Sequence, residues 1–328
     1  MSTSELGRRP RRSRPAGGAR APVRRLLLVA NPHASTVSSR RKALVREALA
    51  SRYLVEPVDT SGRDDATALT RAAAADGFDL VVTLGGDGTA NEAANGLAGS
   101  QTALACLPGG RTNVFSRALG GSPDLMEAAA SLVRAADAFE PRRIDLGLMN
   151  GRYFAFASGI GIAAATNAHI ERRPHLKARF GERYYALAGV GTIARDFLRG
   201  APRLRVTAAG RSEEGVAVVV QNTDQLTYFG TRAVRVSEGA GPSTGTLSLS
   251  MLRRAGSLEV LTIAPRALAG DAAAVAAHPQ VEAFARVPRA RVEAIGDRGL
   301  PVEVDGDYLG RVRSVEYGIA PAALFVLT

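Results

Sequence analysis

A short apolar run that stops at three glycines and an aspartate constrains the fold of this chain more than any other stretch. Residues 80–84 read Leu-Val-Val-Thr-Leu, and the turn 85–88 that follows reads Gly-Gly-Asp-Gly. The run is short, continuous and β-rich, which predicts a buried strand, and residues 89–97 favour a helix. Glycines adopt backbone conformations that a Cβ would forbid, so main-chain N–H groups can approach an oxyanion. A helix that opens here adds its unpaired N-terminal N–H groups.

These features predict a nucleotide-phosphate site at the turn 85–88. Asp87 lies inside the turn, and a carboxylate beside bound phosphate is a ligand that Mg²⁺ prefers. The alternative is a tight strand-to-helix corner in which the glycines only form the turn. An acid enclosed by three glycines after a buried strand favours the phosphate site over that alternative.

Strands and helices alternate through the first 136 residues, which predicts a doubly wound parallel sheet. The expected strands cover residues 25–30, 53–58, 79–84 and 103–107, and the expected helices cover 35–50, 64–75, 89–97, 116–119 and 123–136. Ser35 or Ser38 would cap the first helix. Open parallel sheets bind ligands at the carboxyl ends of their strands. Turn residues follow three of these strands, at 31–32, 85–89 and 108–113, so we expect one shared site there.

After about residue 145 the pattern changes to short β-branched runs separated by glycine or proline, which predicts a mainly antiparallel β-sandwich. The expected strands cover 203–208, 216–221, 233–236, 246–252, 289–295, 302–304 and 311–317. A helix is expected within 171–198, either packed in the core or forming a lipid-facing wall. Asp305-Gly306 is a strong hairpin signal between the run 302–304 and residues 308–312.

The net charge of +11 is concentrated at the N-terminus. Residues 1–25 contain eight arginines against one glutamate, together with three prolines. This composition predicts a disordered basic tail over residues 1–22. Such a tail is attracted to anionic lipid headgroups or to nucleic acid, or it is simply solvated without a partner. It lacks the apolar core of a secretory signal, and the uncharged window 153–170 is too polar to span a bilayer.

Cysteine and histidine usage points away from disulfide and metal chemistry. Cys106 is the single cysteine and lies in the apolar run 102–107, so we expect a buried structural thiol. The four histidines, at positions 33, 169, 175 and 278, have no metal-ligand spacing and are interpreted as structural or surface residues.

Three turns in fixed order carry a resemblance to a known family. They are Asn31-Pro32, then Gly85-Gly86-Asp87-Gly88-Thr89-x-Asn91-Glu92, then Pro108-Gly109-Gly110-x-Thr112-Asn113. This combination resembles the diacylglycerol kinase catalytic domain, in its bacterial lipid kinase branch, which is related to sphingosine and ceramide kinases. Asp145 within Ile144–Gly147, the glycines 159 and 161, and Asp305-Gly306-Asp307 look like the family's C-terminal landmarks.

The resemblance implies an ATP-binding α/β domain over residues 23–145 and a β-sandwich lipid-binding domain over 146–319. It places the active site in the cleft between them, and residues 320–328 can pack back on the first domain. The implied activity is transfer of the γ-phosphoryl group of ATP to a hydroxyl of a lipid such as diacylglycerol or a sphingoid base, with ATP and Mg²⁺ as cofactors.

The resemblance also suggests a role for each matched residue. Asp307, which ends the Asp-Gly-Asp turn, is the expected proton acceptor, Asp87 the expected metal ligand, and Asp145 and Asp305 supporting acids. The expected ATP-binding residues, with Ser35 taken from its place in the first turn, are Asn31, Pro32, Ser35, Thr60, Gly85, Gly86, Gly88, Thr89, Asn91, Glu92, Gly109, Gly110, Thr112 and Asn113.

The chain departs from the family pattern at four points. His33-Ala34-Ser35-Thr36 follows Asn31-Pro32 without the usual glycine and lysine, and the proton acceptor is aspartate instead of glutamate. Ser243-Thr244-Gly245 replaces an Asp-Gly that binds a structural Mg²⁺ in some bacterial members, and Ala163 follows the glycines 159 and 161 where many members have an acid. Two alternatives therefore stay open: a soluble-nucleotide kinase of the NAD kinase type, and a catalytically weak protein that binds lipid or nucleotide.

The expected partners and location follow from the implied lipid kinase activity and from the basic N-terminal tail. We expect a lipid substrate at a membrane surface, with anionic lipid met by the basic tail, no dedicated nucleic-acid partner, and a cytoplasmic protein attached peripherally to the membrane. The sequence leaves the oligomeric state open, a dimer included.

Overall fold

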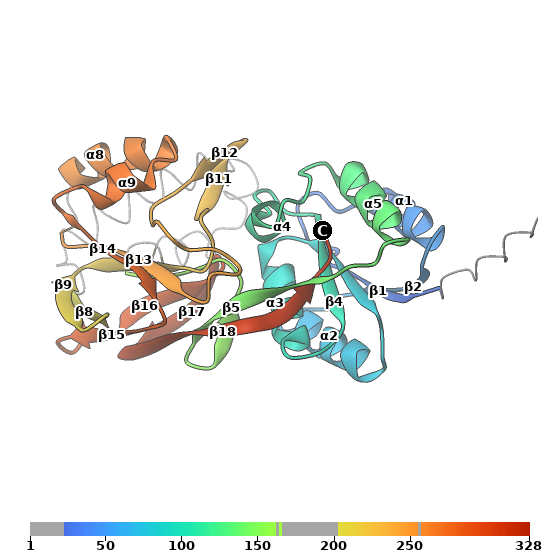
Figure 1. The fold of residues 1–328 in the computed structure, drawn as a ribbon, viewed down its shortest axis with the longest axis horizontal. Helices are drawn as coiled ribbons and strands as arrows, with labels where there is room; N and C mark the ends of the chain where they lie inside the picture. Colours follow the sequence, from blue (N-terminus) through green and yellow to red (C-terminus); the bar gives the residue numbers. More distant parts are fainter. Residues whose placement is uncertain (1–22, 162–163, 166–202, 255–256) are drawn as a thin grey trace, which may run out of the picture.

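One twisted sheet runs through both halves of the molecule (Figure 1). The computed structural model describes residues 23–161, 164–165, 203–254 and 257–328. The expected tail 1–22, the helix expected within 171–198, and His169 and His175 lie outside these ranges. Within the described ranges, no helix is long and apolar enough to cross a membrane.

The first half is the parallel α/β unit that the sequence predicts. Four parallel strands lie in the order β2-β1-β3-β4. They are β1 (Arg25–Ala30), β2 (Leu54–Asp59), β3 (Leu80–Gly85) and β4 (Ala103–Pro108). All six residues of β3 are buried, because helices cover both faces of the sheet.

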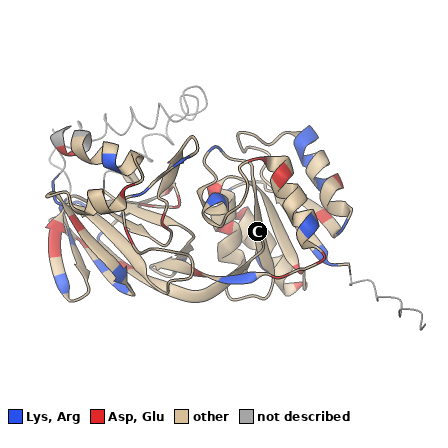
Figure 2. Cartoon of the chain, turned by 45° about the horizontal axis from the view of Figure 1, so that its top comes forward, with Lys and Arg blue, Asp and Glu red and all other residues tan. Residues whose placement is uncertain are grey.

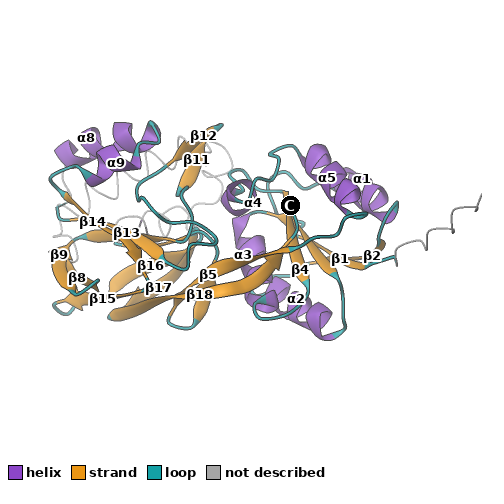
Figure 3. Cartoon of the chain, in the orientation of Figure 1, coloured by secondary structure: helices purple, strands orange, loops and turns teal. Residues whose placement is uncertain are grey.

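Each face of this sheet is packed by its own helices. α1 (Ser39–Ala50) and α5 (Leu125–Ala135) bury apolar residues against one face, and α2 (Asp65–Ala75) and α3 (Asp87–Leu97) against the other (Figures 1 and 3). Ser38 caps α1 by accepting a hydrogen bond from the Arg41 N–H. The short helix α4 (Val114–Ala118) follows β4.

Helix α3 begins two residues earlier than expected. Gly86 is its N-cap and has extended backbone, so Asp87 and Gly88 belong to the first helical turn instead of the preceding loop. An acidic residue in the first turn is favoured by the positive end of the helix dipole. The helix therefore holds the Asp87 side chain in a fixed position.

The second half is a β-sandwich, as the sequence predicts. A six-stranded sheet in the order β14-β13-β10-β7-β16-β17 packs on the continuation of the large sheet through β15, β8 and β9. The strands of the smaller sheet are β7 (Ala157–Ile160), β10 (Ala217–Gln221), β13 (Leu247–Leu252), β14 (Val281–Val287), β16 (Leu300–Val304) and β17 (Asp307–Val312). Five further strands of the large sheet are β5 (Arg142–Met149), β6 (Arg152–Phe154), β8 (Arg203–Ala208), β9 (Arg211–Gly215) and β15 (Arg289–Ile295).

The final strand, β18 (Ser314–Val326), joins the two halves. It pairs with β15 in the sandwich, with β5 in the middle, and with β4 through Val326 and Leu104. The expected domain boundary at 145/146 falls inside β5, which pairs with β18 along most of its length.

The single strand expected over residues 311–317 is wrong. The chain turns at Arg313, where β17 of the smaller sheet ends and β18 of the large sheet begins. The Arg313 side chain donates to the carbonyls of Gly296 and Asp297 and fixes this turn. Arg313 and Ser314 are consecutive polar residues and interrupt the alternation here, but an interruption of one residue does not by itself show that the chain changes sheet.

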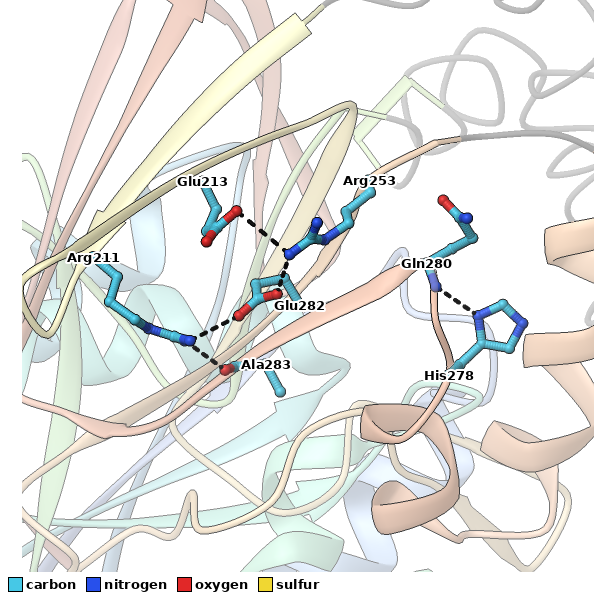
Figure 4. Close-up of polar contacts among 7 residues, drawn as sticks. All are labelled: Arg211, Glu213, Arg253, His278, Gln280, Glu282 and Ala283. Atoms are coloured by element: carbon cyan, nitrogen blue, oxygen red, sulfur yellow. Dashed lines mark hydrogen bonds and ion pairs between the residues drawn. The ribbon is translucent and has the colours of Figure 1, made fainter.

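The sequence does not predict six of the strands, β5, β6, β7, β9, β11 (Thr227–Phe229) and β14, or the helices α8 (Ser257–Leu268) and α9 (Ala272–Ala276). An ion-pair network connects β9 and β14 with Arg253, the residue that follows β13. Glu282 pairs with Arg211 at 3.0 Å and with Arg253 at 2.6 Å (Figure 4). Next to it, His278 Nδ1 accepts a hydrogen bond from the Gln280 N–H. His278 is thus a structural residue, as expected.

Candidate functional site

The three strand-end turns of the first half are joined by main-chain hydrogen bonds. The Asn31 N–H donates to the Leu84 carbonyl at 3.0 Å, and the Gly109 N–H donates to the Gly85 carbonyl at 2.8 Å. The Thr36 N–H closes the set by donating to the Gly109 carbonyl at 3.2 Å. The turns therefore form one surface at the carboxyl edge of the sheet.

Two of these turns approach so closely that only glycine fits. A Cβ on Gly110 would lie 2.8 Å from the Gly86 Cα, and a Cβ on Gly109 would lie 2.8 Å from the Gly85 nitrogen. Such distances are shorter than carbon atoms tolerate, so any side chain would force the turns apart. The glycines thus bring the two backbones together beside the N-terminus of α3.

Asp87 is held rigidly at that N-terminus. One carboxylate oxygen accepts from the Phe115 N–H at 3.0 Å, and the other accepts from the Thr112 hydroxyl at 3.2 Å. Burial raises the pKa of Asp87 despite these donors, and the charge of Asp307 raises it further. The side chain links α3 to α4 through Phe115 and to the third turn through Thr112.

The structure brings Asp307 to the same place from the second half of the chain. A Cβ on Gly88 would lie 3.2 Å from the Asp307 Oδ2, so the carboxylate lies against the first turn of α3. Asp307 is the first residue of β17, and the hairpin turn Asp305-Gly306 precedes it. Asp87 and Asp307, which are 220 positions apart in the sequence, thus meet at the junction of the two halves.

Asp305 does not have the open position of a supporting acid. Its side chain is 3% exposed and accepts from the N–H groups of Ala155, Phe156 and Ala157 at 2.6–3.0 Å. It also accepts from the Asn91 amide at 2.6 Å. Burial raises the pKa of Asp305 to about 7 against the effect of the backbone donors. We interpret Asp305 as a positioning residue that fixes the turn before Asp307.

Asn91 and Glu92 likewise bond to protein groups and not to an open site. Asn91 is 2% exposed, and its amide donates to the Tyr153 carbonyl as well as to Asp305. The Glu92 carboxylate accepts from the N–H groups of Asp64 and Ala66 and so caps the N-terminus of α2. Both side chains are thus bonded to protein groups, and their expected contact with ATP stays a prediction.

Asp145 hydrogen-bonds to main-chain groups outside the strand-end turns. Its carboxylate accepts from the Gly245 N–H at 2.7 Å and from the Ala322 N–H at 2.8 Å, and the side chain is 6% exposed. Asp145 therefore ties β5 to the loop 241–245 and to β18. Its oxygens bond to neither of the groups that hold Asp87, so the structure shows a structural use of this carboxylate and the expected supporting role stays a prediction.

The other expected site residues lie along the strand-end surface. Asn31 donates to the Thr89 hydroxyl at 3.1 Å and accepts from the His33 N–H. Pro32 and Ser35 are exposed in the first turn, and Thr60 is buried after β2. Asn113, with φ +46°, accepts from the Gly110 N–H and donates to its carbonyl, so it braces the third turn.

Two residues that the sequence analysis misses support this junction. Asn95 donates to the Tyr153 carbonyl and accepts from the Tyr153 N–H, both at 3.0 Å. Arg117 on α4 donates to the carbonyls of Gly230 and Thr231 and lies 3.5 Å over the Tyr228 ring. The spacing of Asn91 and Asn95, one helical turn apart on the same face of α3, is a signal that a search for buried amides could have used.

The residues present fit a divalent cation that also binds phosphate. In the described part of the chain, no three His, Cys, Asp or Glu side chains converge as a complete metal site. Asp87 and Asp307 nevertheless place two mutually repelling carboxylates together, and a hard cation with oxygen ligands would neutralise them. A site with two carboxylates that is completed by phosphate oxygens is typical of Mg²⁺.

Comparison with known families gives two matches that together span nearly all of the described chain. Residues 25–148 match the family described as "Diacylglycerol kinase catalytic domain". Residues 157–328, which are more than half of the chain, match "YegS C-terminal NAD kinase beta sandwich-like domain". This chain belongs to the diacylglycerol kinase catalytic domain family, with a YegS-like C-terminal domain. The resemblance expected from the three turns is thus confirmed.

Several diacylglycerol kinases are similar to this family member along most of their length. A diacylglycerol kinase of Bacillus subtilis is 28% identical over 261 residues, which cover 76% of this chain and 78% of the relative. One from Mycobacterium tuberculosis is 28% identical over 282 residues, covering 83% and 85%. The family assignment makes this chain a distant homologue of lipid kinases that use ATP.

Solved structures share the fold. The crystal structure of a diacylglycerol kinase from Bacillus anthracis superposes with a TM-score of 0.65 at 20% identity, covering 92% of this chain and 96% of that chain. A second structure from the same organism has a TM-score of 0.71 at 22% identity and the same coverage. The arrangement of a parallel α/β unit and a β-sandwich is therefore shared by these proteins.

Proposed function

We propose that this chain is an ATP-dependent lipid kinase that transfers the γ-phosphoryl group to a hydroxyl of a lipid such as diacylglycerol or a sphingoid base. The observation that carries the proposal is the position of Asp307 against Gly88, in the first turn of α3 and beside Asp87. Phosphoryl transfer to an alcohol needs charge neutralisation at the phosphates and a carboxylate near the hydroxyl. Both requirements are met by residues at this junction.

The strand-end surface supports the binding of the triphosphate. Gly85, Gly86, Gly109 and Gly110 bring backbone close together without side chains, and the α3 N-terminus adds its dipole. Ser35 and Thr36 supply hydroxyls where the family has a lysine. Phosphate is then held by backbone dipoles and hydroxyls with less point charge, so we propose a modest affinity for ATP.

Asp87 would hold Mg²⁺, which leaves the Asp307 carboxylate for the acceptor hydroxyl. The cation, when bound, neutralises charge on the β- and γ-phosphates. Because the Phe115 N–H and the Thr112 hydroxyl fix the Asp87 carboxylate, it needs no reorientation to serve as a ligand.

Asp307 is the proposed proton acceptor. It would accept the proton of the lipid hydroxyl as the hydroxyl oxygen bonds to the γ-phosphorus and the bond from phosphorus to the ADP oxygen breaks, which yields a lipid phosphate and ADP. Aspartate is one methylene shorter than the usual glutamate, so the acceptor must come closer to β17. The fixed hairpin turn before Asp307 orients the carboxylate for this approach.

The test is transfer of labelled phosphate from ATP to a panel of diacylglycerol, sphingosine and ceramide, with NAD included. We expect a labelled lipid from the wild type and a 10²–10⁴-fold lower kcat for Asp307→Asn, the usual contribution of a general base. Asp297→Asn, an exposed aspartate in the same half, is the matched control. Labelled NAD without labelled lipid, or an Asp307→Asn variant of wild-type activity, would overturn the proposal.

The proposed enzyme meets its substrate at a membrane surface on the cytoplasmic side. A lipid acceptor partitions into bilayers, so the enzyme must reach it there. The N-terminal 25 residues carry a large excess of arginine, which favours an anionic membrane surface. Deletion of residues 1–22 should weaken binding to anionic vesicles without changing turnover of a water-soluble acceptor.

A further inference from the structure

The small hairpin of β11 (Thr227–Phe229) and β12 (Arg232–Val234) is separate from both large sheets. It rises between α8 and α4 at the junction of the two halves (Figure 1). Its four tip residues, Phe229, Gly230, Thr231 and Arg232, are all exposed. We propose that this hairpin tip is the element that docks on an anionic lipid surface, an inference that rests on the proposed lipid kinase function.

The tip combines an apolar ring and a cation on one face. Phe229 is 53% exposed and pairs directly with Arg232 across the hairpin. Directly opposed residues of an antiparallel pair project from the same face, so the ring and the guanidinium stand side by side. This pairing of an apolar group with a cation suits the boundary between headgroups and acyl chains.

Helix α8 covers the base of this face and leaves the tip uncovered. Val234, on the same face as Arg232, is buried with Ala267 of α8, and the Arg235 N–H donates to the Ala267 carbonyl. Leu268, the last residue of α8, is 44% exposed. In the described part of the second half, Phe229 and Leu268 are the large apolar side chains that stand most exposed, and they belong to these two adjoining elements.

The charge around the tip selects anionic lipid over other apolar partners. Of the two arginines in residues 227–235, Arg235 pairs with Asp224 at 3.3 Å. Helix α8 contains both Glu259 and Arg266, so the unbalanced charge at the tip is that of Arg232. In Figure 2 the helix at the place of α8 carries both blue and red, so α8 is not uniformly basic. Arg232 forms no ion pair with any residue in the described ranges, so its charge is available to a headgroup phosphate.

The opposite face of the hairpin is fixed to the nucleotide half. The Arg117 guanidinium lies 3.5 Å from the centre of the Tyr228 ring and donates to the carbonyls of Gly230 and Thr231. Arg117 belongs to α4, and the α4 residue Phe115 holds Asp87. Docking at the tip would therefore place the bilayer beside the junction where Asp87 and Asp307 meet.

Co-sedimentation of the full chain with vesicles tests the proposal without ATP or diacylglycerol. Phosphatidylcholine vesicles with and without phosphatidylglycerol are the probes. We expect Phe229→Ser to lower the partition coefficient about fivefold to tenfold, since part of a phenyl ring no longer leaves water. Arg232→Gln should lower it about fivefold on the anionic vesicles alone and reduce its salt dependence.

Matched controls separate the tip from general surface effects. Leu54→Ser removes an apolar side chain of similar exposure, 56%, on the edge strand β2, and Arg289→Gln removes an exposed charge on β15. Both should partition as the wild type does. The proposal is overturned if the tip variants and the control variants lose vesicle binding equally. It is also overturned if both tip variants bind vesicles as the wild type does, which is the result expected when the basic tail alone binds lipid or when the tip binds a protein.

The same measurements keep the docking proposal distinct from the proposed activity. Vesicle partition requires no catalysis, so a tip-dependent partition without any phosphorylated lipid would leave the docking surface in place and remove the kinase. If lipid is phosphorylated but vesicle binding does not depend on the tip, the kinase activity is supported and the docking surface is not.

Discussion

Asp305 shows how a carboxylate can support a reaction without touching the reacting groups. It accepts hydrogen bonds from three successive N–H groups of the segment 155–157 and from Asn91 on α3. One side chain thus joins the turn before Asp307 to both halves of the molecule. The position of the proposed proton acceptor relative to α3 depends on these four contacts.

Asp305→Asn should therefore cost both stability and turnover. An amide offers one acceptor oxygen where the carboxylate offers two, and its NH₂ would face an N–H donor. We expect a loss of about 2–3 kcal/mol in the free energy of unfolding, from buried donors left unsatisfied. We expect kcat to fall with little change in the KM for ATP, measured by urea denaturation and steady-state kinetics.

Asp307→Asn, two positions away, is the matched comparison for this prediction. It should lower kcat while changing the free energy of unfolding by less than Asp305→Asn does, because Asp307 is only partly buried and the substitution also relieves its repulsion with Asp87. Equal stability of both variants would show that Asp305 does not brace the turn.

Cys106 gives a prediction about pH. The structure places Cys106 at intermediate exposure and not fully buried as expected, and the partial burial raises the pKa of the thiol to about 12. The thiolate is the form that reacts with alkylating reagents. At pH 8 roughly one thiol in ten thousand is ionised, and the fraction grows as pH rises toward the pKa. Iodoacetamide should leave the folded protein unmodified at pH 8 by mass spectrometry and give one adduct in denaturant. Rapid labelling of the folded chain at one site at pH 8 would contradict the raised pKa of the Cys106 thiol.

The sequence predicts the positions of Asp87 and Asp307 but not the orientation of Asp305. The strand–glycine–aspartate pattern places Asp87, and the pairing of Val304 with Asp307 follows from the Asp-Gly signal. The inward orientation of Asp305 does not follow, because it requires φ +49° at this residue and donors from residues 155–157. Those donors are about 150 positions away, and no local pattern reports them.

At the scale of elements, close packing of α2 against α3 positions the helix that carries Asp87. A Cβ on Gly96 would lie 2.6 Å from the Thr67 carbonyl oxygen and would also clash with the Thr70 hydroxyl. The Thr67 hydroxyl donates to the Glu92 carbonyl, and the Glu92 carboxylate caps α2. Glycine is thus required at this helix crossing although it lowers helix propensity.

Gly96→Ala should destabilise the protein by about 1–3 kcal/mol, since overpacking outweighs the gain of about 1 kcal/mol in helix propensity. Gly62→Ala is the control, because nothing lies within 4 Å of its Cβ position and its φ is not positive. Both variants are compared by chemical denaturation. An unchanged midpoint for Gly96→Ala would mean that α2 and α3 separate easily.

The elements that the sequence misses share a physical cause. Three of the parallel strands, β1, β3 and β4, are mostly buried and read as continuous apolar runs. They and the largely exposed edge strand β2 are predicted within one residue of their ends. In the sandwich, β14 has one partly exposed face and reads as a mixed segment. The change of sheet at Arg313 is set by its contacts with Gly296 and Asp297, which no periodicity can show.

At the scale of the whole molecule, β18 makes the two halves depend on each other. Its first residues pair with β15 in the sandwich, and its last residue pairs with β4 of the nucleotide half. Leu324, Val326 and the following Leu327 are at most 4% exposed and pack in the cores of the first half. The parallel sheet is therefore completed by the last residues of the chain.

Deletion of residues 321–328 should prevent stable folding of the nucleotide half. Each buried aliphatic side chain contributes about 1.5–3 kcal/mol, so the loss of three approaches the whole stability of a typical domain. Deletion of the exposed Thr328 alone is the control and should leave the unfolding transition in place. Circular dichroism and urea denaturation measure both. If the shortened chain keeps the helical signal of α1 to α5 with an unchanged midpoint, β4 does not need its neighbour, and the two halves fold independently of each other.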